Sequence, residues 1–389
     1  MISINNIERR DKLKLNIDEF QLSSQIKNFL QQYQDNIWLV GGAARDRMLG
    51  REPDDYDFLV SDVNEKVLSQ LLPEAKKVGK SFPVYLWQGV EFSWTQEQEP
   101  ARELKRRDFT INSLAISLAD GKILDFHNGL EDLNKGLIQP LPGALKSDPH
   151  RYYRCLRFLA QFPDFDLSTH CWQKLKTVKD REIEKIAVER VAEEFKKVLS
   201  APAGERFFYA LIELEGLRYH FTWLKENLLM SIKRWQTASC LTGREKLLFI
   251  SLALNAGSAK ELEAARNYLP LAQKWYRAAA IASEAVPIIR KWQDISCDQL
   301  AKVYESFAAG VLTPAEAIFI ARVCDLSQFE LKKPLVINYY QNLEKMWDKM
   351  SEEITGDALR EKMKPGPEIG RELFRRRSKW LEKNRQYYR

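Results

Sequence analysis

The first part of the chain alternates short apolar runs with polar turns, a pattern typical of strands joined by short helices. Residues 37–40 form an apolar run of strand length, and 43–49 have the composition of a short helix. Residues 55–60 alternate polar and apolar side chains, as a half-buried strand does. Residues 115–126 hold two strand-like runs around an Ala-Asp-Gly turn, which predicts a hairpin. The pattern therefore predicts a mixed α+β domain.

The chain changes character near residue 199, where glycine becomes sparse and helical periodicity dominates. The clearest helical stretches are 259–268, 272–285 and 300–308. Near the start of the chain, 17–33 is amphipathic and predicts a leading helix. The expected division is a helical extension over 1–36, a mixed head over 37–140, a helical neck over 141–205, and a helical body and tail over 206–389.

Two carboxylates stand out in the predicted strand 55–60. Alternation along a strand puts residues i and i+2 on one face, so Asp55 and Asp57 would point the same way. Two such carboxylates repel each other, and hard oxygen ligands suit Mg²⁺ that holds the phosphates of a nucleotide. An isolated Asp-x-Asp is more often a turn or a solvated strand edge, so the surrounding motifs decide between the two interpretations.

A glycine turn precedes this strand. Gly41-Gly42 lets the backbone approach a phosphate, and the helix that follows offers free amide donors at its N-terminus. Arg45 lies in the first turn of that helix, where its guanidinium can reach phosphate oxygens. The turn lacks the Gly-Lys-Ser/Thr of a Walker loop and the third glycine of a dinucleotide-binding turn. The layout therefore favours nucleotidyl transfer over either of those folds.

A cationic cluster over 105–107 stands directly before the apolar segment 109–115. A charge run by itself is usually a solvated surface. Positive charge held beside a core segment is, however, well placed to meet phosphates. Asp108, between the two segments, can orient one arginine through a bidentate ion pair.

Residues 147–158 predict a helix with Asp148 near its start. Arg151, Arg154 and Arg157 are spaced by three residues and lie on neighbouring parts of one helix face. A carboxylate acceptor together with guanidinium donors can match the Watson–Crick edge of a base. Taken alone, three arginines on a solvated helix would be the better interpretation.

Together these motifs resemble those of the class II tRNA nucleotidyltransferase and bacterial poly(A) polymerase family. The matching segments lie between residue 37 and about residue 199, and include Val-Gly-Gly-Ala-Ala-Arg-Asp at 40–46, Asp-Tyr-Asp at 55–57, Arg-Arg-Asp-Phe-Thr-Ile-Asn at 106–112 and Asp-Phe-His-Asn-Gly-Leu-Glu-Asp-Leu at 125–133. The resemblance implies a polymerase-beta-like nucleotidyltransferase head with a mixed sheet, followed by an all-helical neck, body and tail.

The resemblance also implies roles for individual residues. Asp55 and Asp57 would be catalytic and bind Mg²⁺. The residues that would bind nucleotide are Gly42, Arg45 and Arg107 on the triphosphate, and Asp148, Arg151 and Arg154 on the base. The family usually has Glu where this chain has Ser147, which leaves the orientation of Arg151 open. Glu91, on a strand predicted over 84–94, is a candidate third acidic group, although an exposed strand glutamate is the commoner case.

The reaction that the resemblance implies is addition of CMP from CTP, and of AMP from ATP, to the 3′ end of tRNA with release of pyrophosphate. Full CCA-adding relatives carry a longer loop than the segment between Glu91 and Lys105 allows, which favours the CC-adding subgroup. Two alternatives stay open. One is a poly(A) polymerase, and the other is a catalytically inactive RNA-binding homologue.

Composition agrees with this interpretation. The chain of 389 residues is 45% apolar and can form more than one core. No apolar run reaches the length of a membrane span, so no membrane partner is expected. The five cysteines have no paired spacing, which favours reduced thiols in a cytoplasmic protein over zinc ribbons. The four histidines include no His-Asp pair, so an appended metal phosphohydrolase domain is not expected.

Positive charge is concentrated at the end of the chain. Residues 360–389 hold 11 Lys and Arg against 4 Asp and Glu, a net charge of +7, while the whole chain carries +6. A basic tail supports binding of a phosphate backbone at low sequence specificity. The candidate RNA contacts are Arg371, Arg375, Arg376 and Arg377, with the tRNA acceptor arm as the expected partner. A solvated helix is the equal alternative for any one of these arginines.

Overall fold

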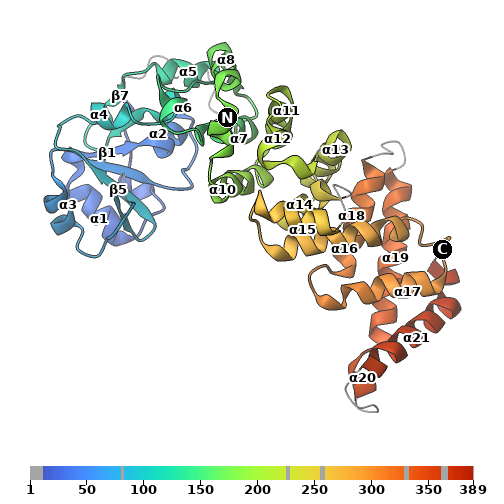
Figure 1. Ribbon diagram of the computed structural model, residues 1–389. Helices are drawn as coiled ribbons and strands as arrows, with labels where there is room; N and C mark the ends of the chain where they lie inside the picture. The colour runs from blue at the N-terminus through green and yellow to red at the C-terminus, as the bar shows by residue number, and fades with distance from the viewer. Residues whose placement is uncertain are drawn as a thin grey trace. The chain divides into compact units, whose positions relative to one another are not determined.

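The structure is a computed structural model that describes residues 12–79, 83–224, 228–254, 259–327, 333–360 and 367–388 (Figure 1). The chain forms two compact units, Met1–Ile183 and Glu184–Arg389, and the boundary falls within the segment predicted as a neck. The finer division into four parts stays a prediction. In the described ranges, no helix combines the length and apolar character needed to cross a membrane.

The first unit is built on a mixed sheet whose strand order is β3-β4-β5-β2-β1-β6-β7. The strands are β1 (Ile37–Val40), β2 (Asp57–Val60), β3 (Lys76–Val78), β4 (Val84–Trp87), β5 (Val90–Trp94), β6 (Leu114–Ser117) and β7 (Ile123–Asp125). Strand β2 pairs in parallel with β5, and the other neighbours pair antiparallel. The α+β class, the strand over 37–40 and the hairpin over 115–126 are confirmed.

Aromatic side chains cover one face of this sheet. Tyr56 and Phe58 stack with ring centroids 5.9 Å apart, and Phe58 and Phe92 stack at 5.6 Å. Phe20 lies 5.1 Å from Tyr56, and Phe29 meets Phe92 edge-on at 5.6 Å. Such ring pairs add about 0.5–1.5 kcal/mol each beyond the area they bury. The segment before β1 is therefore packed onto the sheet.

The amphipathic segment 17–33 forms two helical pieces. A 3-10 turn, η2 (Ile17–Glu19), comes first, and α1 (Ser24–Gln32) begins anew after it. Ser23 accepts a hydrogen bond from the backbone N–H of Ile26 and so caps α1. The amphipathic pattern runs through both pieces because both bury apolar side chains against the sheet, but the cap starts a separate helix.

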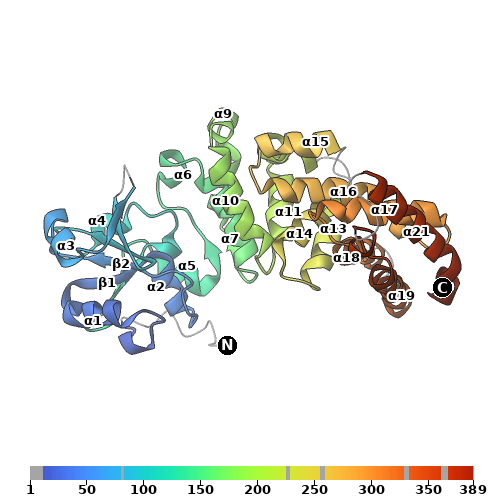
Figure 2. The same ribbon diagram turned by 90° about the horizontal axis from the view of Figure 1, so that it is seen from below.

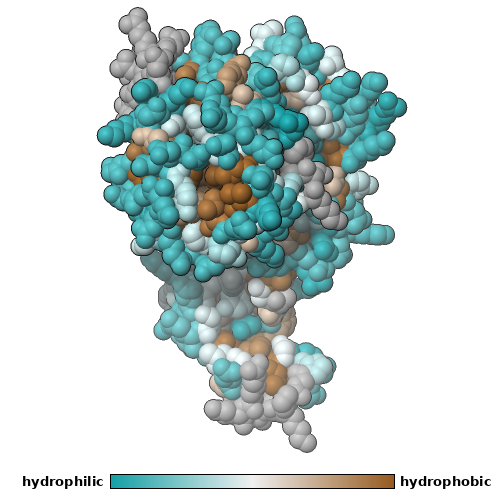
Figure 3. Space-filling model, turned by 90° about the vertical axis from the view of Figure 1, so that its left-hand side faces the viewer, coloured by the Kyte–Doolittle hydropathy of each residue, from teal (hydrophilic) through white to brown (hydrophobic). Residues whose placement is uncertain are grey.

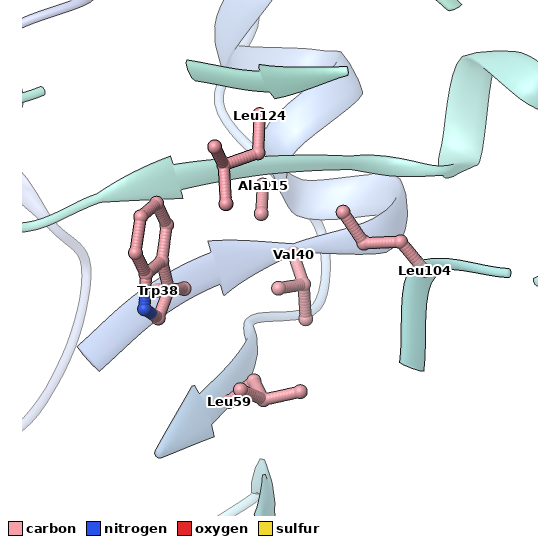
Figure 4. Close-up of a cluster of buried hydrophobic side chains, with 6 residues drawn as sticks. All are labelled: Trp38, Val40, Leu59, Leu104, Ala115 and Leu124. Atoms are coloured by element: carbon pink, nitrogen blue, oxygen red, sulfur yellow. The ribbon is translucent and has the colours of Figure 1, made fainter. Parts of the chain in front are cut away.

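The other face of the sheet carries a buried apolar cluster formed by Trp38, Val40, Leu59, Leu104, Ala115 and Leu124 (Figure 4). Strands alternate, so Asp57, two residues before Leu59, lies on this same face at the start of β2. Burial of each large apolar side chain contributes roughly 1.5–3 kcal/mol. The cluster therefore fixes the strand end from which Asp57 projects.

The strand predicted over 84–94 is instead the hairpin of β4 and β5. Gln88 and Gly89 both have positive φ, +50° and +85°, as a two-residue hairpin turn requires. Gln88-Gly89 interrupts the apolar run at this point, but the sequence prediction treated the segment as one strand. The hairpin brings β5 beside β2, where parallel pairing sets Glu91 opposite Asp57.

The helices that follow β1 complete the first unit. They are α2 (Gly41–Met48), α3 (Glu65–Leu71), α4 (Ala101–Leu104), α5 (Gly129–Lys135), α6 (Ala144–Ser147), α7 (Arg151–Gln161) and α8 (Thr169–Thr177), with α9 (Asp180–Glu184) at the boundary and a short parallel pair of β8 (Leu137–Ile138) and β9 (Asp166–Leu167). Asp125 caps α5 by accepting hydrogen bonds from the backbone N–H groups of Gly129 and Leu130, each at 2.9 Å. Figure 3 views this unit from outside and shows a mostly hydrophilic surface with hydrophobic residues gathered in one area.

The described residues of the second unit form helices (Figure 2). The α-helices are α10 (Val188–Leu199), α11 (Glu205–Glu213), α12 (Leu217–His220), α13 (Leu228–Ser239), α14 (Glu245–Ala253), α15 (Ala259–Ala264), α16 (Gln273–Ile289), α17 (Cys297–Ser306), α18 (Pro314–Leu326), α19 (Lys333–Glu353), α20 (Asp357–Arg360) and α21 (Pro367–Asn384). The helical periodicity predicted for 259–268, 272–285 and 300–308 is confirmed.

Candidate active site

A cleft of about 840 Å³ opens in the first unit. Its charged lining residues are Asp57, Glu91, Glu103 and Asp148 on the acidic side, and Lys105, Arg106, Arg107 and Arg151 on the basic side. Of the site residues predicted from the sequence, Asp57, Arg107, Asp148 and Arg151 therefore meet in one cavity. A cavity that joins carboxylates to guanidinium groups is suited to a ligand that carries both phosphates and a cation.

Asp57 and Glu91 form the acidic end of the cleft. Strand β2 begins at Asp57, whereas Asp55 lies in an exposed bend before it, so the alternation argument is wrong for Asp55. Asp55 is nevertheless close enough to raise the pKa of both Asp57 and Glu91. The bend at Asp55 and the pairing of β2 with β5 together give three carboxylates that act on one another.

Arg107 compensates the charge of this acidic group only in part. Burial raises the pKa of Asp57, and Arg107 opposes that shift while Asp55 adds to it. Burial likewise raises the pKa of Glu91, with a further contribution from Asp57. A raised pKa means that the charged carboxylate is disfavoured here. A cation would relieve this cost.

Gly41 lies directly against this acidic end. It has φ +68°, and a Cβ built on it would stand 2.9 Å from Nη1 of Arg107 and 3.2 Å from Oδ2 of Asp57. Nη1 of Arg107 and Oδ2 of Asp57 are 3.8 Å apart. Gly42, by contrast, has room for a Cβ at 3.5 Å from its nearest neighbour, Nη2 of Arg45. The sequence motif indicated both glycines, but only the positive φ identifies Gly41 as the one the site requires.

Arg45 does not extend into the cleft. Its guanidinium is buried, pairs with Asp46 at 2.8 Å and donates to Oδ1 of Asn112 at 2.7 Å. The guanidinium also lies over the rings of Phe158 and Phe162, at 5.6 and 4.8 Å from their centroids. This position favours a structural role over the phosphate contact that the sequence predicts for Arg45.

Helix α7 brings Arg151 to the cleft. Its Nη1 donates to the carbonyl of Ala144 at 3.1 Å and to Oγ of Ser147 at 3.2 Å, and its Nη2 donates to the carbonyl of Arg106 at 2.9 Å. Asp148 precedes α7 in an extended conformation and accepts a hydrogen bond from the backbone N–H of His150 at 3.2 Å. A carboxylate acceptor and a guanidinium donor therefore line one end of the cleft.

Arg154, three residues further along α7, is directed at Asp108 instead. Its Nε donates to Oδ2 of Asp108 at 2.8 Å, and its Nη2 contacts the same oxygen. Burial raises the pKa of Asp108, but Arg154 and Asn112 outweigh this, so the net pKa is lowered. The arginine that pairs with Asp108 is thus Arg154, through one carboxylate oxygen and not as the bidentate pair expected, and the base contact predicted for Arg154 finds no support in this geometry.

The basic tail is less available than its charge suggests. Glu372 accepts from both Arg375 and Arg376, at 2.8 and 2.7 Å, and these hydrogen bonds lower the pKa of Glu372 to about 2. Arg377 pairs with Glu305 and lies over the ring of Tyr304 at 4.8 Å. Arg377 therefore holds α21 against α17. An RNA contact stays a prediction for Arg371, Arg375 and Arg376.

Comparison with known proteins connects this site to a family. The family model described as "Poly A polymerase head domain" matches residues 37–87 and 88–139, and the model "Probable RNA and SrmB- binding site of polymerase A" matches 164–227. The chain is 33% identical over 203 residues to a Multifunctional CCA protein of Chromobacterium violaceum, and 29% identical over 210 residues to a CCA-adding enzyme of Coxiella burnetii. The matched segments, residues 37–139 and 164–227, are those of the class II tRNA nucleotidyltransferase and bacterial poly(A) polymerase family.

These alignments cover 46–49% of this chain and 49–55% of the two family members, so the chain spans about half the length of the curated relatives it matches. Solved structures extend the likeness in fold. A Thermotoga maritima CCA-adding enzyme complexed with tRNA matches with a TM-score of 0.68 at 20% identity, covering 94% of this chain and 93% of that one. A CCA-adding enzyme with CTP matches with a TM-score of 0.67 at 19% identity, covering 94% and 96%. The family fold therefore extends through both units.

Ser147 is where this chain departs from the family motif, which usually has Glu. The structure shows that the serine hydroxyl takes over one part of that task, because its Oγ accepts from Nη1 of Arg151. Two backbone carbonyls, those of Ala144 and Arg106, supply the other acceptors. Three of the acceptors that orient Arg151 are thus uncharged groups.

Proposed function

We propose that this protein is a tRNA 3′-terminal nucleotidyltransferase that adds CMP from CTP to the tRNA 3′ end and releases pyrophosphate. The observation that carries the proposal is a cleft whose lining brings Asp57, Glu91 and Arg107 together with Asp148 and Arg151. An acidic end suits metal-assisted phosphoryl chemistry, and a donor–acceptor pair suits recognition of a base. Similar solved structures include CCA-adding enzymes with tRNA, with CTP and with ATP, which supports the same substrates.

Mg²⁺ fits the acidic end as the cofactor. Asp57 and Asp55 supply hard oxygen ligands, and the raised pKa of Asp57 is the physical sign that a cation is favoured there. Across the described ranges, no three His, Cys, Asp or Glu side chains approach closely enough to hold a metal ion by themselves. This agrees with a site that is completed by substrate oxygens, as is usual for Mg²⁺. When bound, the ion would lower the pKa of the attacking hydroxyl and neutralise the leaving phosphates.

The protein's own groups would orient the nucleotide. Arg107, with 30% of its side chain exposed beside Asp57, is positioned to contact the triphosphate. The absence of a side chain at Gly41 lets that guanidinium lie against the backbone, because a Cβ there would stand 2.9 Å from Nη1 of Arg107. Asp148 would accept from, and Arg151 donate to, the Watson–Crick edge of the incoming base. With these assignments, side chains of the cleft select the incoming base, in place of a nucleic-acid template.

Incubation of a tRNA that lacks its 3′ terminus with CTP alone, ATP alone and both, followed by sequencing of the 3′ ends, tests the function. We expect addition of two C residues with CTP. A terminal A that appears only when both nucleotides are present would identify full CCA addition, and its absence would identify the CC-adding subgroup. Long A tails from ATP alone would show a poly(A) polymerase. No incorporation despite tRNA binding would show an inactive homologue.

Ser147→Ala is expected to raise the KM for CTP by about fivefold. The substitution removes one of the hydrogen bonds that hold Arg151, and a hydrogen bond of this kind is worth about 1 kcal/mol. Steady-state kinetics with CTP measures the effect, and Ser147→Glu, which restores the usual family residue, serves as the matched variant with a KM at or below the wild-type value. An unchanged KM in Ser147→Ala would contradict a role for this hydroxyl in orienting Arg151.

A further inference from the structure

Helix α7 contacts the segment that carries Arg107 at two points. On one side, Nη2 of Arg151 donates to the carbonyl of Arg106 at 2.9 Å. On the other side, Nε of Arg154 donates to Oδ2 of Asp108 at 2.8 Å, and Nη2 adds a second contact to the same oxygen. The two residues that flank Arg107 in the sequence are thus each held by an arginine of α7.

Asp108 is itself fixed from several directions. Its Oδ1 accepts from the backbone N–H of Phe109 at 2.9 Å and from Nδ2 of Asn112 at 2.8 Å, and its backbone carbonyl accepts from the N–H of Leu141 at 3.0 Å. A buried carboxylate needs such partners, because an unpaired charge in the interior is strongly disfavoured. The carboxylate of Asp108 therefore fixes the position of the backbone next to Arg107, and its own position depends on Arg154.

The same network continues to the glycine turn. Oδ1 of Asn112 accepts from Nη1 of Arg45 at 2.7 Å, and Arg45 in turn pairs with Asp46 on α2. A continuous set of polar contacts thus runs from α7 through Asp108 and Asn112 to the helix that begins at Gly41. Arg107 is the guanidinium that this network leaves directed at Asp57, 3.8 Å from its carboxylate oxygen.

We propose that Arg154 is a positioning residue, which holds Arg107 against Asp57 through its ion pair with Asp108 and does not read the base. The inference rests on the proposed function, because the triphosphate of CTP is taken as the ligand of Arg107. The sequence predicts that Arg154 contacts the base, because it is spaced three residues from Arg151. The positioning role replaces that prediction. Two arginines of α7 then have different roles. Arg151 contacts the base, and Arg154 positions Arg107, which contacts the phosphate.

A double-mutant cycle tests the proposal. Arg154→Gln is expected to lower kcat/KM for CTP by about 100-fold, the order of loss that a misplacement of about 1 Å produces. Arg107→Ala is expected to cause a similar loss. Both substitutions act on the same contact, that of Arg107 with the triphosphate. The double variant should therefore lose no more activity than Arg107→Ala alone. Losses that multiply in the double variant would overturn the proposal.

Base preference supplies the second measurement. A positioning residue affects every nucleotide alike, so the ratio of CTP to UTP incorporation should not change in Arg154→Gln. A base-reading residue would relax this ratio, and a relaxed ratio would therefore overturn the proposal. Arg102→Gln is the matched control, because Arg102 is an exposed arginine on α4 that does not line the cleft.

Loss of Arg154 leaves Asp108 without its cation, so folding must be checked. Arg154→Lys keeps a positive charge but offers a single donor group in place of the two-nitrogen contact, and we expect it to recover activity in part at a melting temperature close to wild type. No recovery in a folded Arg154→Lys variant, together with multiplying losses, would exclude the ion pair as the cause.

Equilibrium binding of CTP distinguishes failure of the proposed function from failure of the role proposed for Arg154. If the wild type and Arg102→Gln incorporate no CMP, the proposed function fails. CTP affinity in the same four proteins of the cycle then still decides the role of Arg154. Affinity losses in Arg154→Gln and Arg107→Ala that do not add support positioning of Arg107, whereas additive losses contradict it.

Discussion

Asp57→Asn is expected to lower incorporation of CMP by a factor of about 1000 or more while tRNA binding is retained. Metal-assisted stabilisation of developing charge is worth several kcal/mol, and each 1.4 kcal/mol corresponds to a tenfold change in rate. The asparagine amide keeps the size of the side chain but supplies neither the charge nor both oxygen ligands. Single-turnover incorporation with saturating CTP measures the loss, and gel-shift of tRNA measures binding.

The same substitution is expected to raise the melting temperature of the protein in the absence of Mg²⁺. Burial and Asp55 raise the pKa of Asp57, so its ionised form opposes folding at neutral pH. A raised carboxyl pKa adds stability below the ordinary aspartate pKa of 3.8, and that contribution is lost as the pH rises through the folded value. The increase in melting temperature caused by Asp57→Asn should therefore be present at neutral pH and become smaller towards pH 4.

Asp55→Ala provides the comparison for this experiment. We expect it to abolish incorporation as well, because Asp55 is the second oxygen ligand of the proposed metal, while tRNA binding stays intact. Asp55 lies in an exposed bend, so its removal should have less effect on the melting temperature than the Asp57 substitution. Turnover near the wild-type level in either variant would contradict the metal assignment.

Gly41→Ala is expected to lower incorporation by about 100-fold. The new Cβ would stand 2.9 Å from Nη1 of Arg107, and the flexible end of that side chain would have to move away from Asp57. The backbone contributes a separate cost, because alanine at φ +68° is disfavoured by roughly 1–2 kcal/mol. Steady-state kinetics and thermal unfolding measure the two effects separately.

Gly42→Ala is the matched variant, since it adds the same methyl group one residue later. Its Cβ would meet Nη2 of Arg45 at an ordinary contact distance of 3.5 Å. We expect a much smaller loss of activity than for Gly41→Ala, together with unchanged or slightly increased stability, because alanine is favoured over glycine within a helix. Equal losses in the two variants would show that phosphate approaches the backbone at Gly42 as the sequence motif predicts.

Local patterns determined the main elements of the site. The strand before Gly41, the helix after it and the helical pattern of α7 follow from residues that are neighbours in the sequence, so apolar periodicity and glycine placement were sufficient to predict them. The cap of α5 by Asp125 and the departure at Ser147 could be predicted in the same way. The tail charge was also evident, although the pairing of Arg377 with Glu305, 72 residues away, was not.

Contacts between distant residues were decided only by the tertiary structure. Glu91 stands beside Asp57 because β2 pairs in parallel with β5, and Arg154 meets Asp108 across 46 residues of sequence. The spacing of arginines along α7 gives their direction around the helix axis, but it cannot tell which faces the cleft and which faces a buried carboxylate. Sequence determined which chemical groups are available, and packing decided which of them meet, because pairing of strands and burial of charge depend on the whole domain.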